Sequence, residues 1–171
     1  MEIAPFSAWR YDPSRVDIAD VVTQPYDKIT PELQARYYRA SPYNLVRMVL
    51  GDPKVEEADV YQAAATHFRE WRDRGVLRRD AEPSLYVYSQ RFTVPGSTQE
   101  VERRGLMALG RIYDYSDAVV FRHEQTLAKP KQDRLNLLRA TRAQFEQIFM
   151  VYSDPEGEVD ALLPASSAPE M

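Results

Sequence analysis

The sequence predicts a mixed α+β fold, in which helices pack on a small mixed sheet. Residues Glu56–Arg74 repeat apolar side chains at the spacing of an amphipathic helix. Two runs rich in aromatic and β-branched residues, Leu85–Val94 and Glu100–Tyr113, flank the turn Pro95-Gly96-Ser97 and predict an antiparallel hairpin near residues 85–113. The mixed order of strands and helices favours α+β over a regular doubly wound sheet.

The N-terminal part begins with β-type and apolar segments. Ile3–Tyr11 alternates weakly and predicts a short strand, and Ile18–Val22 is a second short apolar piece. It leads into Gln24-Pro25-Tyr26-Asp27, which we expect to form a loop because proline removes a backbone donor. In that loop Asp27 caps local N–H groups while Tyr26 packs, or the two side chains form the wall of a substrate or nucleotide site.

A helix follows this loop, and a strand follows the helix. Thr30-Pro31-Glu32 supplies an N-cap and a proline at the first helical position, and we expect the helix to stop before Ser41-Pro42. Asn44–Leu50 is mostly apolar and predicts a strand. Because a buried arginine must be paired, Arg47 in this segment is either an edge residue or an anion ligand.

The later elements are predicted from start and stop signals. Gly75 is a natural C-terminal cap for the long helix, and His67 within that helix is expected to be a surface or packing residue. A further helix is predicted from Lys131, after the start signal of Pro130. Phe145–Tyr152 predicts a closing strand.

Composition bounds the class of protein. The 171 residues include 44% hydrophobic residues, so we expect one domain over residues 1–155, with 156–171 as a flexible tail or the truncated start of further sequence. Cysteine is absent, which excludes disulfides and thiolate zinc sites and fits the cytoplasmic location that we expect. No apolar run approaches the ~20 residues of a membrane span, so we expect no membrane association.

The net charge and the absence of common motifs count against several functional classes. The formal net charge of −4 gives no strong nucleic-acid signal. Neither common phosphate-binding glycine loop occurs, nor does G-x-S-x-G. These observations count against P-loop enzymes, typical nicotinamide enzymes and the common serine hydrolases.

The side chains that can do chemistry gather in Arg122–Arg142. This stretch is basic in an acidic chain, which indicates either a focused anion site or a solvated helix face. Cationic side chains and helix N-termini both favour phosphate, so we expect Lys131, Arg134 and Arg139 to be its ligands. The predicted phosphate or nucleotide site is completed by Thr126, Arg47, Asn44, Tyr26 and Asp27.

The catalytic candidates are His123 and Glu124, which place a base and a carboxylate side by side. Either can move a proton. Glu124 can also hold Mg²⁺ together with phosphate oxygens, since Mg²⁺ needs only one or two carboxylates. One histidine with one glutamate is too few ligands for a zinc site.

Taken together, these segments resemble an uncharacterised family of bacteria and archaea, the domain of unknown function 1015. The matching segments follow one another over most of the chain: Q-P-Y-D-K-I at Gln24–Ile29, N-L-V-R at Asn44–Arg47, F-R-E-W-R-D-R-G-V-L-R-R-D at Phe68–Asp80, L-Y-V-Y-S-Q-R-F at Leu85–Phe92, R-R-G-L at Arg103–Leu106, and H-E-Q-T-L-A-K-P-K-Q-D-R-L-N-L-L-R-A-T-R at His123–Arg142. Gln24 departs from an expected proline, and Glu146-Gln147 stand where the family more usually has Ser-Pro. Family members look substantially longer, so the resemblance implies that this chain is an N-terminal portion. It implies no established activity.

A weaker, fold-level resemblance is to the superfamily of ParB, sulfiredoxin and free-serine kinase. It implies ATP or another nucleotide as ligand, with the phosphates over the start of the Lys131 helix. It also implies that His123 and Glu124 lie near the metal or the γ-phosphate. Fold alone does not determine function.

We therefore expect a protein that binds a nucleotide or a small phosphorylated ligand, as a small-molecule kinase or a phosphohydrolase. The alternative is a non-catalytic module, either nucleotide-gated and regulatory or dedicated to protein interaction. The substrate, the oligomeric state and the presence of catalysis stay open at this point.

Overall fold

The computed structural model describes residues 1–56, 59–123, 125 and 127–163. Helices and small antiparallel sheets make up these residues, so the predicted α+β class is confirmed. The chain divides into two compact units, each described here by itself. We call Trp9–Asp80 with Arg122–Glu146 the helical unit, and Met1–Ala8, Ala81–Phe121 and Gln147–Met171 the hairpin unit.

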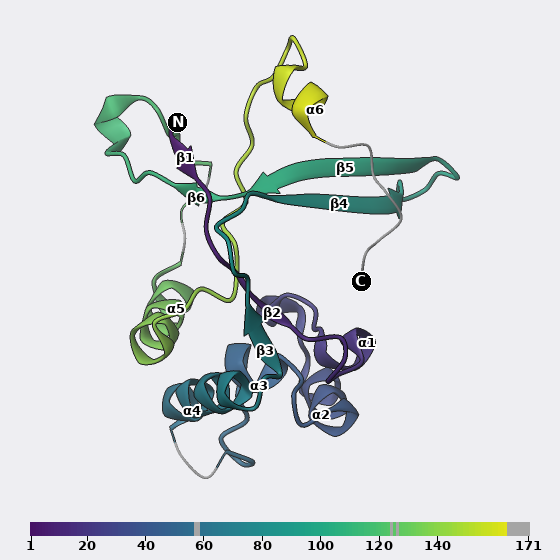
Figure 1. Ribbon diagram of the computed structural model, residues 1–171, viewed down its shortest axis with the longest axis vertical. Helices are drawn as coiled ribbons and strands as arrows, with labels where there is room; N and C mark the ends of the chain where they lie inside the picture. The colour runs from purple at the N-terminus through teal and green to yellow at the C-terminus, as the bar shows by residue number, and fades with distance from the viewer. Residues whose placement is uncertain (57–58, 124, 126, 164–171) are drawn as a thin grey trace. The chain divides into compact units, whose positions relative to one another are not determined.

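The helical unit combines five α-helices with one short two-stranded sheet among its described residues (Figure 1). Its strands pair antiparallel, with Trp9 opposite Arg79 and Tyr11 opposite Leu77. Its elements are β2 (Trp9–Tyr11), α1 (Ile18–Val21), the 3₁₀ turn η1 (Tyr26–Lys28), α2 (Pro31–Ala40), α3 (Val46–Val49), α4 (Val60–Asp73), β3 (Leu77–Arg79) and α5 (Ala128–Thr141).

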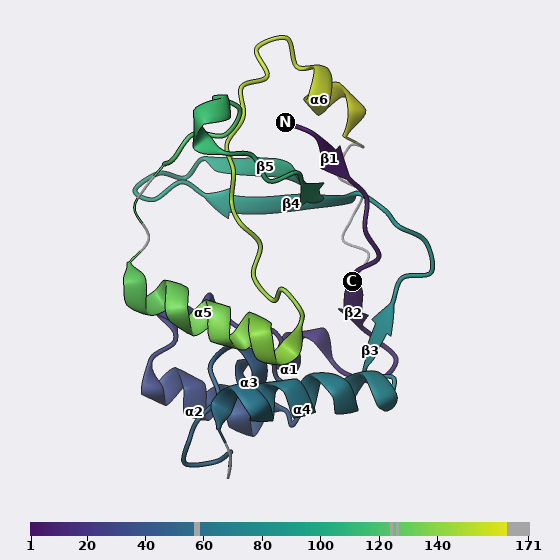
Figure 2. The same ribbon diagram turned by 90° about the vertical axis from the view of Figure 1, so that its left-hand side faces the viewer.

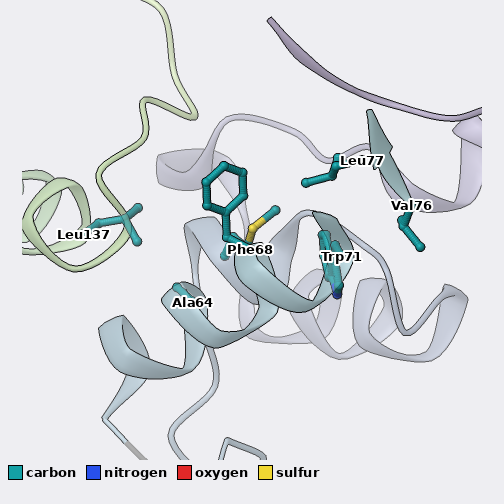
Figure 3. Packing of buried hydrophobic residues seen from close by; sticks show 7 residues of the cluster. Ala64, Phe68, Trp71, Val76, Leu77 and Leu137 are labelled. Atoms are coloured by element: carbon teal, nitrogen blue, oxygen red, sulfur yellow. The ribbon is translucent and has the colours of Figure 1, made fainter. Parts of the chain in front are cut away.

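The core of this unit forms around α4 (Figure 3). One face of α4 carries Ala64, Phe68 and Trp71, all buried, because the helical repeat places them on one side. Buried Leu137 of α5 joins the same cluster, and Figure 2 shows α5 lying along α4. The cluster therefore fixes α5 against the rest of the unit by burial of apolar surface.

Local capping signals set the ends of α2 and α4, and one of these ends differs from the prediction. Thr30 caps α2, since its hydroxyl accepts from the Leu33 N–H at 3.3 Å. The helix predicted from Glu56 begins at Val60 instead, because the Asp59 carboxylate accepts from two N–H groups of the first turn. Gly75 follows α4 with φ of 71°, the left-handed conformation that glycine adopts without strain.

One expectation for the N-terminal half was wrong. Asn44–Leu50 is not a strand: it forms the short helix α3, whose Val46, Met48 and Val49 are buried. Short apolar runs do not distinguish a buried strand from a buried helix, and here the Asn44 side chain accepts from the Val46 N–H at 3.0 Å and favours the helical turn. In the apolar piece Ile18–Val22, for which no element type was predicted, Ile18–Val21 form α1, capped by Asp17.

The hairpin unit is built on short antiparallel pairs. It holds β1 (Ile3–Ala4) paired with β6 (Leu109–Gly110), β4 (Tyr86–Thr93) paired with β5 (Glu100–Met107), the 3₁₀ turn η2 (Tyr115–Asp117) and α6 (Glu158–Leu162). The predicted hairpin is thus confirmed as β4–β5, drawn as a long two-stranded ribbon in Figure 1. The predicted strand Ile3–Tyr11 divides into β1 and β2, which pair with different partners.

The expectation of a strand over Phe145–Tyr152 was wrong, since no strand forms there. Its residues have high β-propensity, but a strand requires a partner edge, and no described strand pairs with it. Residues 156–171, expected as a tail, include α6, and residues 164–171 lie outside the described part. The prediction of one domain over residues 1–155 stays a prediction.

Candidate functional site

Helix α5 carries three of the predicted phosphate ligands, Lys131, Arg134 and Arg139, and its first turn is electrostatically unusual. It begins at Ala128 rather than at the expected Lys131, and Pro130 lies inside the first turn, where its missing N–H is not needed. Leu127 at the N-cap position supplies no side-chain cap, and the first turn has no acidic residue. Lys129 and Lys131 lie there instead, both exposed.

Three predicted site residues precede this turn. His123 is exposed. Glu124 and Thr126, the predicted metal ligand and one predicted phosphate ligand, lie outside the described residues. In the part of the chain that the structure describes, no group of three or more histidine, aspartate or glutamate side chains is arranged to hold a metal ion.

One turn farther along α5, Arg134 is the centre of a network. Its Nη2 donates to the carbonyl oxygen of Val49 at 2.8 Å, and its Nε donates to the Asp133 carboxylate at 2.9 Å. Its Nη1 lies 3.5 Å from Oε1 of Glu146. Its guanidinium carbon lies 4.0 Å from the centre of the Tyr26 ring. Arg134 thus joins α5 to the end of α3, to η1 and to the segment after α5.

Carboxylates compensate the positive charge of Arg134. Burial raises the pKa of Glu146, and the negative charges of Asp27 and Asp133 raise it further, against the lowering effect of Arg134. Asp133 also accepts from the Tyr61 hydroxyl at 2.8 Å, a hydrogen bond that raises the pKa of Tyr61. With two carboxylates, Asp133 and Glu146, paired with one guanidinium, the positive charge of Arg134 is compensated within the fold.

The structure therefore brings together Tyr26, Asp27 and Arg134 from the predicted set. Tyr26 stacks on Arg134, and the charge of Asp27 acts on Glu146, which faces Arg134. Arg139 lies exposed farther along α5. Glu146 and Asp133 belong to the same network and were not among the predicted site residues. Asp133 adjoins Arg134 in the sequence, but only the fold shows that Glu146 lies nearby.

Asn44, one of the predicted ligand residues, makes hydrogen bonds within the helical unit. It is fully buried, and its Nδ2 donates to the carbonyl oxygens of Asp20 at 2.7 Å and Val22 at 3.3 Å. Its Oδ1 accepts from the Val46 N–H. Its amide thus connects the end of α1 to the start of α3, and these hydrogen bonds occupy both its donor and its acceptor.

Arg47 belongs to a second buried network. Its guanidinium carbon lies 4.3 Å from the centre of the Tyr38 ring, and its Nη1 lies 3.6 Å from Oε1 of Glu56. Glu56 also accepts from the Tyr38 hydroxyl at 2.8 Å and lies 2.9 Å from Nε2 of His67. The Arg47 Nε is buried without a hydrogen-bond partner.

This second network shows how Arg47 is paired, which the sequence did not decide. Arg47 is paired, as a buried arginine must be, and its partner is Glu56. Burial raises the pKa of Tyr38, and the hydrogen bond to Glu56 raises it further, while a hydrogen bond from the Asp52 N–H and the charge of Arg47 lower it. His67, expected to be a surface or packing residue, is a partly buried member of this network.

None of the helices in the described residues is both long enough and apolar enough to cross a membrane. No curated protein matches this chain. No solved structure matches it either. A family model described as "Protein of unknown function (DUF1015)" matches residues 3–171, nearly the whole sequence, and the chain therefore belongs to that family.

Proposed function

We propose that this chain binds the phosphate groups of a nucleotide, or of a small phosphorylated molecule, at the first turn of α5. There it acts as a small-molecule kinase or a phosphohydrolase. The observation that carries the proposal is the composition of that turn, which has two lysines, no acidic residue and no side-chain cap.

Without a bound anion, the two lysines in the first turn of α5 are electrostatically unfavourable. The N-terminus of a helix is its positive end, and each misplaced charge there costs ~0.3–1 kcal/mol. The N–H groups of Ala128 and Lys129 have no acceptor within the helix, since the first four N–H groups of any helix lack one. A phosphate would be attracted by these N–H groups and by the side chains of Lys129 and Lys131 together.

In this proposal Arg134 does not bind phosphate directly. Its charge is compensated by Asp133 and Glu146, and its stacking on Tyr26 holds η1 against α5. We assign it the positioning of α5. Lys131 and Lys129 are the ligands proposed for phosphate.

The chemistry in this proposal comes from the residues before the helix. His123 is the group proposed to move a proton to or from the reacting oxygen. Mg²⁺, bound with the nucleotide, would neutralise charge on the phosphates. One carboxylate is sufficient to hold it, since Mg²⁺ keeps several waters and takes further ligands from phosphate, and Glu124 is the proposed ligand. The fold-level resemblance to the ParB and free-serine-kinase superfamily points to the same ligand class.

A melting experiment tests the binding step. The full chain is heated with ATP, ADP, pyrophosphate or inorganic phosphate, each with and without Mg²⁺. A ligand present at 100 times its Kd stabilises by about 2.7 kcal/mol, or roughly 5–10 °C for a chain of this size. The double variant Lys129→Ala, Lys131→Ala should lose this shift.

The other two lysines of the chain provide a matched control. Lys28 and Lys54 are both exposed, and replacing both by alanine changes the net charge by the same amount. This control variant should keep the full shift. An equal loss in both double variants would mean that only the overall charge matters, and the proposed site would be rejected. No shift with any phosphate compound would reject it as well.

Catalysis is tested separately from binding. Release of phosphate, or transfer to a small acceptor, should disappear in His123→Ala while the melting shift remains. If binding occurs without turnover in the wild type, the chain is a nucleotide-gated module. The alternative role in protein interaction is supported by the exposed apolar residues of the hairpin unit.

A further inference from the structure

The helical unit carries an arginine-rich surface beside an exposed indole, that of Trp9. Residues 9–15 and 69–80, which include β2, β3 and the end of α4, hold seven arginines against four acidic residues. The formal net charge of the whole chain is −4. An acidic average therefore conceals a local basic excess, and such an excess attracts anionic partners.

The pairing of β2 with β3 places Trp9 and Arg79 side by side. The Asp12 N–H donates to the Val76 carbonyl at 2.9 Å, so these opposed residues form a hydrogen-bonded pair. Hydrogen-bonded and non-hydrogen-bonded pairs alternate along an antiparallel ladder. Given the register, Trp9 and Arg79 form a non-hydrogen-bonded pair, in which the opposed side chains share one face and come closest.

Arg72 of α4 lies on the same indole. Its guanidinium carbon lies 4.7 Å from the centre of the Trp9 ring and 5.1 Å from the centre of the Phe68 ring. Phe68 is buried and meets Trp9 edge-on, with ring centroids 6.3 Å apart. The two rings hold the guanidinium in place, so an anion that binds it would cost less side-chain entropy.

Arg72 and Arg79 are exposed, and neither has a carboxylate partner among the residues that the structure describes. Their neighbours are paired at 2.7–3.7 Å: Arg10 with Asp80, Arg78 with Asp12, and Arg74 with Glu70. Arg134 also stacks on a ring, that of Tyr26, but carboxylates and a carbonyl occupy its edges. The edge N–H groups of Arg72 are thus open to an anion.

We propose that Trp9, Arg72 and Arg79 bind single-stranded nucleic acid, with a base stacked on the indole and phosphates on the two guanidinium groups. Guanidinium groups bind phosphate with paired hydrogen bonds. Arg72 covers the indole only in part, since Trp9 is 39% exposed. A single strand has unstacked bases that can lie on an aromatic ring. An acidic peptide could pair with the arginines but would supply no base to stack on the indole.

Titration of the full chain with an oligothymidylate of about 12 nucleotides tests this proposal. The chain has two tryptophans, and Trp71 is 2% exposed, so quenching by a stacked base reports on Trp9. The wild type should be quenched, and a polyglutamate peptide should bind more weakly than the oligonucleotide. Trp9→Leu keeps an apolar side chain against Phe68. By anisotropy of a labelled strand, it should raise the Kd at least about fivefold, the effect of losing one stacked base.

Salt dependence identifies the phosphate contacts. Arg72→Gln and Arg79→Gln should each raise the Kd and reduce the slope of log Kd against log salt concentration by about 0.7, the value for one phosphate of a single strand. Arg74→Gln is the matched control. It removes the same charge from the same end of α4, but Arg74 is paired with Glu70, so the slope should stay as in the wild type.

A further control separates this surface from the first turn of α5. The double variant Lys129→Ala, Lys131→Ala should bind the oligothymidylate as tightly as the wild type. The proposal would be overturned by an unquenched wild type, by tighter binding of polyglutamate than of the oligonucleotide, or by equal losses in Arg72→Gln and Arg74→Gln. Loss of oligothymidylate binding in the double lysine variant would overturn it as well.

Discussion

The guanidinium carbon of Arg134 lies 4.0 Å from the centre of the Tyr26 ring, although 108 positions separate the two residues in the sequence. The ring covers one face of a guanidinium whose edges are occupied by Asp133, Glu146 and the Val49 carbonyl. This contact connects η1 to α5. It places the Gln24–Ile29 segment and the Lys131 helix, recognised separately in the sequence, in one network.

Replacing Arg134 should lower stability whether or not a ligand binds. Arg134→Ala removes a charged hydrogen bond to Val49 and leaves Glu146 without its cation, and we expect the free energy of unfolding to fall by about 2–3 kcal/mol. Arg134→Lys should recover only part of this, because an ammonium does not reproduce the planar stacked geometry. Urea unfolding measures both variants. Arg139→Ala, exposed on the same helix, should change stability by less than ~0.5 kcal/mol.

Glu146 should make stability depend on pH in a defined direction. Its folded-state pKa is raised, so between its unfolded and folded pKa values the folded state binds more protons than the unfolded state. The contribution of Glu146 to the free energy of unfolding is therefore fully present at low pH, and it is lost as pH rises through the folded-state pKa. Glu146→Gln has no such titration. The melting temperature of the wild type relative to Glu146→Gln should fall as pH rises above about 4.3, the ordinary value for glutamate; a rise would contradict the assignment.

Removing the carboxylate of Glu56 should be among the most damaging single changes in the helical unit. Glu56→Ala leaves the 84% buried side chain of Arg47 unpaired, since 16% of that side chain is exposed, and breaking a buried pair costs ~3–5 kcal/mol. The double variant Arg47→Met, Glu56→Ala should be more stable than Glu56→Ala alone, because no unpaired charge then remains buried. Glu70→Ala provides the comparison: its i,i+4 pair with Arg74 is exposed, and its loss should cost less than ~0.5 kcal/mol.

Asn44→Ala separates a structural role from ligand binding. The variant removes hydrogen bonds to the carbonyls of Asp20 and Val22 and leaves the Val46 N–H buried without its acceptor. We expect a loss of about 2–3 kcal/mol without any ligand present. If Asn44 were primarily a ligand contact, the variant would melt like the wild type without ligand and differ from it only when phosphate compounds are added.

The agreement between sequence and structure is best where structure is local. Thr30 and Pro31 are sufficient to begin α2, and the Pro95-Gly96 turn is sufficient to predict the hairpin, because caps and turns depend on a few neighbouring residues. Agreement is worst for short apolar segments. Asn44–Leu50 and Phe145–Tyr152 both have strand-like composition, yet one is a helix and the other has no strand partner.

For the candidate site too, local features could be predicted from the sequence and long-range contacts could not. The sequence by itself determined that cationic residues gather on one helix near its start, that cysteine chemistry is absent, and that the chain has the segments of its family. Only the tertiary structure decided that the charge of Arg134 is compensated, that Arg47 pairs with Glu56, and that the apolar residues 148–152 stay exposed. The physical reason is that composition and capping act between neighbouring residues. The charge and burial of a side chain depend instead on residues that folding brings close from far along the chain.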